Sequence, residues 1–184
     1  VGLRLAARAA EELEASGELA ALGTELAEHG LYVFTLNGFP FGAFHGTRVK
    51  EAVYRPDWRE PARLDYTRRL TRILAALLPE GGAGSISTVP GCFRRRGDGA
   101  EARAEIAAQL LALAADLVAL ARERGRFVAL ALEPEPACLL ETTAEAIAFF
   151  EDELCAAKPL AGFPALTGLD PGRAGAELRR HLGV

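Results

Sequence analysis

The chain lacks methionine altogether and contains few cysteines and lysines. Its three cysteines, Cys92, Cys138 and Cys155, are scattered and form no C-x-x-C pair. An odd, scattered set in a chain of 184 residues indicates free thiols in a reducing compartment, because small secreted folds that depend on disulfides carry paired cysteines. We therefore expect unpaired thiols and a cytoplasmic location.

Features typical of nucleic-acid-binding and membrane proteins are also missing. The formal net charge is −4 and the longest basic run is Arg94-Arg95-Arg96, so nothing indicates nucleic-acid binding. No uncharged apolar run reaches about 18 residues, the length needed to cross a bilayer, and we expect no membrane span. No secretory signal pattern opens the chain.

Common catalytic motifs are absent as well. The sequence has no G-x-G-x-x-G, no P-loop, no G-x-S-x-G and no H-E-x-x-H motif. The order of serine, histidine and aspartate residues does not by itself define a catalytic triad. Candidate functional residues must therefore come from the predicted fold.

The two ends of the sequence indicate a partial domain. There is no initiating methionine, and Leu182-Gly183-Val184 resembles the opening of a strand. We expect one domain over residues 1–184, long enough for a sizeable core and truncated at both ends.

Strand-like and helix-like segments alternate along the whole chain, which predicts an α/β fold with a parallel sheet. Three helix starts show a capping pattern, Asp57 with Glu60, Asp98 with Glu101, and Thr142 with Glu145. The expected strands are 1–5, 31–36, 84–89, 127–133 and 182–184, and the expected helices are 6–15, 18–29, 57–78, 98–124, 142–157 and 174–181.

The period of two in the expected strands separates a bulky face from a small, polar face. In 127–133, Val128, Leu130 and Leu132 share one face, whereas Ala129, Ala131 and Glu133 share the other. Glu133 stands at the C-terminal end, where parallel α/β proteins bind ligands. The alternative for Glu133 is a strand-end carboxylate that reaches solvent or pairs with an arginine.

The other strands repeat this arrangement. In the second strand, Tyr32, Phe34 and Leu36 are predicted to face helices. The small, polar faces then bring Arg4, Asn37, Ser87 and Glu133 to one mouth at the C-terminal edge of the sheet, which predicts a ligand site there.

The loop after the second strand supplies further candidates. His45 suits a metal ligand or an acid/base group, or else a loop histidine bonded to local backbone. Lys50 and the Arg94-Arg95-Arg96 run suit an anionic substrate such as a phosphate, although a solvated loop is the favoured interpretation of the arginines. Tyr54 and Trp58 are either pocket walls or, by preference, packing residues.

Several stretches resemble one known family over nearly the whole chain. They are L-Y-V-F-T-L-N-G-F-P-F-G-A-F-H-G, V-K-E-A-V-Y-R-P-D-W, G-S-I-S-T-V-P-G and A-L-E-P-E-P-A-C-L-L-E. They resemble the EboE family of metabolite traffic proteins, which is similar to the xylose-isomerase-like TIM barrels and to sugar phosphate isomerases and epimerases. The first motif is long and specific, whereas L-E-P-E-P is less so.

The resemblance implies a (β/α)8 TIM barrel present only as its second to fifth strands plus the start of the sixth. It implies that Glu133 is a ligand of a divalent metal, Mn²⁺, Mg²⁺ or Zn²⁺, with the remaining ligands expected beyond Val184. His45 matches a histidine that some members place after the third strand.

Two functions are compatible with this resemblance. The first is an isomerase- or epimerase-like enzyme for a small polyhydroxylated or phosphorylated metabolite, with His45 and Glu133 catalytic and Arg4, Asn37, Lys50 and Ser87 binding substrate. Such chemistry needs a metal to polarise a carbonyl and a carboxylate to move a proton. The second is a non-catalytic metabolite carrier or assembly factor that works with other proteins of an export system.

Overall fold

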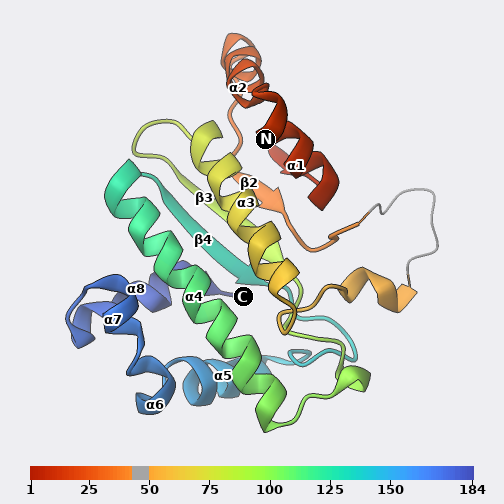
Figure 1. Ribbon diagram of the computed structural model, residues 1–184, viewed down its shortest axis with the longest axis vertical. Coiled ribbons are helices and arrows are strands. Elements are labelled where there is room, and N and C mark those ends of the chain that lie inside the picture. Colours follow the sequence, from red (N-terminus) through yellow and green to blue (C-terminus); the bar gives the residue numbers. More distant parts are fainter. Residues whose placement is uncertain (43–49) are drawn as a thin grey trace.

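The computed structural model describes residues 1–42 and 50–184. Figure 1 shows strands and helices alternating along the chain. The strands are β1 (Gly2–Arg4), β2 (Thr35–Asn37), β3 (Ala83–Thr88), β4 (Phe127–Leu132) and β5 (Leu182–Gly183). The helices are α1 (Ala7–Ser16), α2 (Leu19–Glu28), α3 (Pro61–Leu77), α4 (Ala100–Arg124), α5 (Thr143–Phe149), α6 (Ala157–Leu160), α7 (Phe163–Thr167) and α8 (Pro171–His181). Two 3-10 segments, η1 (Lys50–Tyr54) and η2 (Arg94–Arg96), and a π-helical segment, η3 (Phe150–Leu154), complete the assigned elements.

The strands form one parallel sheet in the order β1-β2-β3-β4-β5. Each strand therefore pairs with its neighbour in sequence, as in right-handed βαβ units that follow one another around a sheet. The sheet is open within the described residues, with β1 and β5 at its edges. The predicted α/β class and the parallel sheet are confirmed.

Helices cover one face of the sheet, as Figure 1 shows for α3 and α4, which cross in front of β3 and β4. Val128, Leu130 and Leu132 of β4 and Ile86 of β3 are buried beneath them. The alternate residues, Ser85, Ser87, Ala129 and Ala131, are only half-buried on the other face. The predicted division into a bulky face and a small, polar face is therefore correct for these two strands.

The predicted faces of the second strand are wrong at its beginning. Only Thr35–Asn37 is a strand, and Val33 is buried whereas Tyr32 and Phe34 are 51% and 47% exposed. Helices α1 and α2 pack on α3 and on each other. The backbone is still paired, since the Phe34 amide donates to the Val1 carbonyl and the Ser85 amide donates to the Phe34 carbonyl.

One of the three predicted helix caps is confirmed. Thr142 and Glu145 form a capping box at the start of α5, in which each side chain accepts a hydrogen bond from the other residue's backbone amide. Glu60 and Gly99, rather than Asp57 and Asp98, occupy the cap positions of α3 and α4, and neither makes a side-chain cap. Asp57 is not the cap because α3 begins only at Pro61; its buried carboxylate instead accepts a hydrogen bond from the Arg59 amide and pairs with the Arg59 and Arg96 guanidinium groups.

Among the described residues, α4 is the one helix long and apolar enough to cross a membrane by length and composition. It packs against α3, β4, α7 and α8 and buries Ile106, Leu110, Leu113 and Leu117 in the core. The core helix of a globular domain has the same properties, so this feature is weak evidence for a membrane segment.

Candidate functional site

A concavity of about 320 Å³ opens at the C-terminal ends of the strands. Arg4, Asn37 and Glu133 line it together with Glu135 and Tyr54, and Phe39, Pro40 and Val53 complete its wall. We refer to this concavity as the mouth. Its position and three of its polar residues agree with the site predicted from the sequence, whereas the roles of these residues stay predictions.

The register of the sheet explains why these residues meet. Arg4 pairs with Asn37, Asn37 pairs with Ser87, and Ser87 pairs with Ala131. Glu133 lies two residues after Ala131, and a period of two returns its side chain to the same face of the sheet. Ser87 belongs to this row but does not line the mouth.

Glu133 is half-buried at the rim of β4. Its backbone amide donates to the Thr88 carbonyl at 2.9 Å, which extends the β3–β4 ladder by one residue and fixes the side chain on the inner face. Across residues 1–42 and 50–184, the Glu133 carboxylate makes no hydrogen bond or ion pair. A half-buried carboxylate without a partner has its acceptor capacity free for a ligand.

Asn37 ends β2 with a local turn. Its side-chain oxygen accepts a hydrogen bond from the Phe39 amide at 3.0 Å, a common way for asparagine to stop a strand. The side-chain amide nitrogen, whose two hydrogens are donors, then remains for the exposed mouth. Asn37 therefore combines a turn role with the predicted binding role.

Tyr54 supplies a polar wall group. Its ring stacks on Phe93 with 5.2 Å between centroids and meets the edge of Phe39 at 5.6 Å. Burial raises the pKa of the Tyr54 phenol, and the neighbouring Cys138 side chain and the Glu135 carboxylate raise it further, so Tyr54 stays protonated and can donate a hydrogen bond. Trp58, by contrast, is fully buried and donates to the Thr88 hydroxyl, which makes it a packing residue.

Two residues of α3 hold the mouth in place, and the sequence interpretation missed both. The Arg63 guanidinium donates to the carbonyls of Gly38, Phe39 and Pro56 at 2.7–3.1 Å. The Tyr66 hydroxyl donates to the Leu5 carbonyl at 2.5 Å. These bonds tie the chain just after Arg4 and Asn37 to one helix. The sequence does contain a sign of the Arg63 role, because the spacing of seven residues places Arg63 on the same apolar face of α3 as Leu70.

The arginine run does not line the mouth, and all three of its members make ion pairs, with Arg95 lying 3.7 Å from Glu51. Arg94 pairs with Glu145 at 2.8 Å and donates to the Cys138 carbonyl, which joins the β3–α4 loop to the start of α5. Arg96 pairs with Asp57 and Glu60, which joins the same loop to the segment before α3. Neither the phosphate role nor the solvated loop applies to these two residues, because each neutralises a carboxylate of the protein.

The other two predicted site residues cannot be placed in the mouth. His45 lies outside the described residues. Lys50 begins η1, but its side chain is also outside what the structure describes.

The described part of the chain contains no cluster of three or more His, Cys, Asp or Glu residues that could hold a metal ion. At the mouth, the carboxylates are Glu133 and Glu135. Two carboxylates are fewer than the all-protein ligand sets typical of tight metal sites. These residues therefore do not form a metal site by themselves, and a metal there needs further ligands.

The cysteines are free, as the sequence predicts. Cys138 lies buried beneath the mouth, where burial and the charge of Glu135 raise its thiol pKa to about 12. Burial also raises the pKa of Cys92. Both thiols therefore stay protonated at neutral pH and are poor nucleophiles.

Comparison with known proteins gave no match to a family model, to a curated protein or to a solved structure.

Proposed function

We propose that the mouth binds a small polyhydroxylated or phosphorylated metabolite, in a chain that forms part of a xylose-isomerase-like barrel of the EboE type. The observation that carries this proposal is the Glu133 carboxylate, which is half-buried at the C-terminal edge of a parallel sheet and has no partner among residues 1–42 and 50–184. Burying a charge in part without a partner costs stability, and such a cost is typical of functional sites.

The chemistry of the lining suits hydroxyl groups and one negative charge. Glu133 and Glu135 accept hydrogen bonds from sugar hydroxyls, whereas the Asn37 amide nitrogen and the Tyr54 hydroxyl donate them. Arg4 adds a cation, whose planar guanidinium matches a phosphate or carboxylate. A concavity of about 320 Å³ is at the small end of the range for metabolite pockets.

The mouth can be tested with a panel of pentoses, hexoses and their phosphate esters, followed by the amide NMR shifts of the purified protein. We expect saturable shifts of the amides of Asn37, Gly38, Phe39, Glu133 and Glu135. Glu133→Gln should weaken binding by about tenfold, because hydrogen bonds to a charged group are worth about 1.5–3 kcal/mol. Glu80→Gln is the matched control, since it makes the same change at an exposed residue before β3. Equal weakening in both variants, or no shifts at the mouth, would exclude this site.

The divalent metal is a separate part of the proposal and rests on the resemblance. Glu133 would be one ligand, and the metal would supply a Lewis acid next to the bound metabolite. In a titration with Mn²⁺ alone, Glu133→Ala should weaken metal binding by at least about tenfold, since even changes behind the ligands cost about 10–100-fold. Unchanged Mn²⁺ affinity in Glu133→Ala removes Glu133 as a ligand. Sugar binding without any metal binding favours the non-catalytic carrier or assembly factor.

A further inference from the structure

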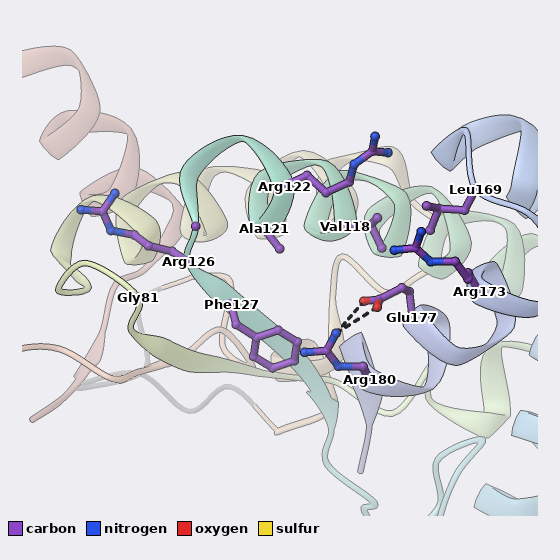
Figure 2. A pocket seen from close by; sticks show the side chains of 11 residues that line it. Gly81, Val118, Ala121, Arg122, Arg126, Phe127, Leu169, Arg173, Glu177 and Arg180 are labelled. Carbon is purple, nitrogen blue, oxygen red and sulfur yellow. Dashed lines mark hydrogen bonds and ion pairs between the residues drawn. The ribbon is translucent and has the colours of Figure 1, made fainter.

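A second concavity of about 320 Å³ lies at the opposite end of the sheet, beside the first residue of β4. Figure 2 shows it between the end of α4, the start of β4 and helix α8. Its charged residues are Arg122, Arg126, Arg173, Arg180 and a single carboxylate, Glu177. We refer to this concavity as the arginine pocket.

Most of the positive charge in the arginine pocket is not neutralised. Glu177 is occupied by Arg180, whose Nη1 lies 2.9 and 3.1 Å from the two carboxylate oxygens. Arg122 donates to the Thr167 carbonyl at 3.0 Å and Arg126 donates to the Leu78 carbonyl at 2.9 Å. No carboxylate within the described ranges pairs with Arg122, Arg126 or Arg173.

Arg173 is the most informative of the four arginines. Arg122 and Arg180 lie in the last turns of α4 and α8, where the helix dipole favours cations. Arg173 is the third residue of α8, after the cap Asp170, and a cation in a first turn opposes that dipole. Its guanidinium makes no hydrogen bond or ion pair with any described residue. Figure 2 shows its side chain extending from α8 toward Val118 of α4.

The wall beside Arg180 is held by packing. The Arg180 guanidinium lies over the Phe127 ring, 5.2 Å from its centroid, and Phe127 packs on His181 at 4.6 Å. His181 is fully buried, and its Nδ1 lies 2.6 Å from the Val128 carbonyl of β4. Since these contacts fix the aromatic wall before any ligand arrives, little ordering is lost on binding.

We propose that the arginine pocket binds the phosphate group of a small phosphorylated molecule. Guanidinium groups present paired N–H donors that match phosphate oxygens, and no described residue occupies the side-chain donors of Arg173. The pocket has the volume of a small-molecule site, and Phe127 offers an apolar wall to the rest of the ligand. The site lies at the end of the sheet away from the mouth and does not depend on the function proposed there.

The test is a titration with inorganic phosphate and with pyrophosphate at constant ionic strength, followed by calorimetry and amide NMR shifts. We expect one saturable site, with shifts at Val118, Phe127 and the first turn of α8. Arg173→Gln should weaken binding by about tenfold or more, because charge-assisted bonds are about twice as strong as neutral ones. Folding should be retained, since the Arg173 side chain has no described partner to lose.

The matched control is Arg95→Gln, which removes the same charge from a side chain that is 82% exposed in the β3–α4 loop. Affinity should be unchanged in this control. Absence of saturable binding, shifts that map elsewhere, or equal weakening by both substitutions would each overturn the proposal. Because the shift map is measured on the unaltered protein, it decides the question even if Arg173→Gln is unstable.

Discussion

Arg63 is a buried cation whose donors go to backbone carbonyls rather than to a carboxylate. Burial lowers its pKa to about 10, so it remains charged at neutral pH. Its guanidinium also lies 5.9 Å from the Phe41 ring centroid and 5.7 Å from the Tyr66 ring centroid. These cation–π contacts offset part of the free-energy cost of removing the charge from water. Arg63 therefore links the stability of the core to the position of the loop that carries Asn37.

We predict that Arg63→Met lowers the free energy of unfolding by about 3 kcal/mol or more. Three carbonyls lose their donor, and each unsatisfied buried polar group costs about 1–3 kcal/mol. Urea denaturation followed by circular dichroism measures the change. Arg124→Met, on the exposed end of α4, should change stability by less than about 0.5 kcal/mol. Similar losses in the two variants would show that the carbonyl bonds are unimportant.

His181 should make the free energy of unfolding depend on pH below 6.5, the ordinary pKa of histidine. Burial lowers its pKa below 6.5, and Arg180 adds to this, whereas Val128 and Glu177 act in the opposite direction. Below pH 6.5 the unfolded chain binds a proton that the folded chain binds less readily, so the free energy of unfolding falls as the pH decreases. Glu145, with a pKa of about 2, titrates outside this window.

The measurement is urea denaturation at about pH 7.5 and about pH 5.5, on either side of the ordinary histidine pKa. The unaltered protein should be less stable at the lower pH, and His181→Gln should reduce that difference. His29→Gln, at an exposed residue after α2, should leave the difference unchanged. If the His181→Gln variant keeps the full pH dependence, other titratable groups cause it.

At the level of elements, the sequence predicted strand positions and buried faces best for the strands that helices cover. In β3 and β4, alternation of bulky and small residues reflects packing under α3 and α4, and both the strand positions and the faces were predictable. The segment before β2 has the same kind of residues, but Tyr32 and Phe34 are exposed and Val33 is buried, so its buried face was not predicted correctly. The ion pairs of Arg94 and Arg96 join segments 36–51 residues apart, and no local pattern encodes such distances.

The capping patterns give a direct comparison between two helix starts. Thr142→Ala removes an observed cap and should lower the free energy of unfolding by about 1 kcal/mol. The same pattern predicts Asp98 as a cap of α4, but Asp98 makes no cap hydrogen bond. Asp98→Ala should therefore lower the free energy of unfolding by less than Thr142→Ala does. The Asp98→Ala variant also loses the 3.5 Å ion pair with Arg94, and a surface ion pair contributes about 0–1 kcal/mol to stability. Equal losses, measured by urea denaturation, would mean that the hydrogen-bond geometry of the α5 cap is unimportant.

For the whole molecule, the sheet leaves two edges and one face uncovered within the described residues. The outer side of β5 adjoins an apolar concavity of about 520 Å³, lined by Ile147, Phe150 and Val184 among others. Ile147 is 53% exposed and Val184 is 66% exposed. Parallel strands are normally buried on both faces, and open edges next to apolar side chains promote pairing between chains.

We therefore predict that the 184-residue chain, prepared alone, associates through the β5 edge. Ile147→Lys should shift sedimentation velocity profiles toward the monomer, because a lysine beside an open edge opposes strand pairing and breaks the apolar surface. Ile147 is exposed on α5, so the substitution should leave the fold intact. Leu166→Lys is the matched control, since Leu166 is 61% exposed on α7 and does not line the concavity. A chain that is monomeric at every concentration, or that responds equally to the two substitutions, would show that the β5 edge is not the associating surface.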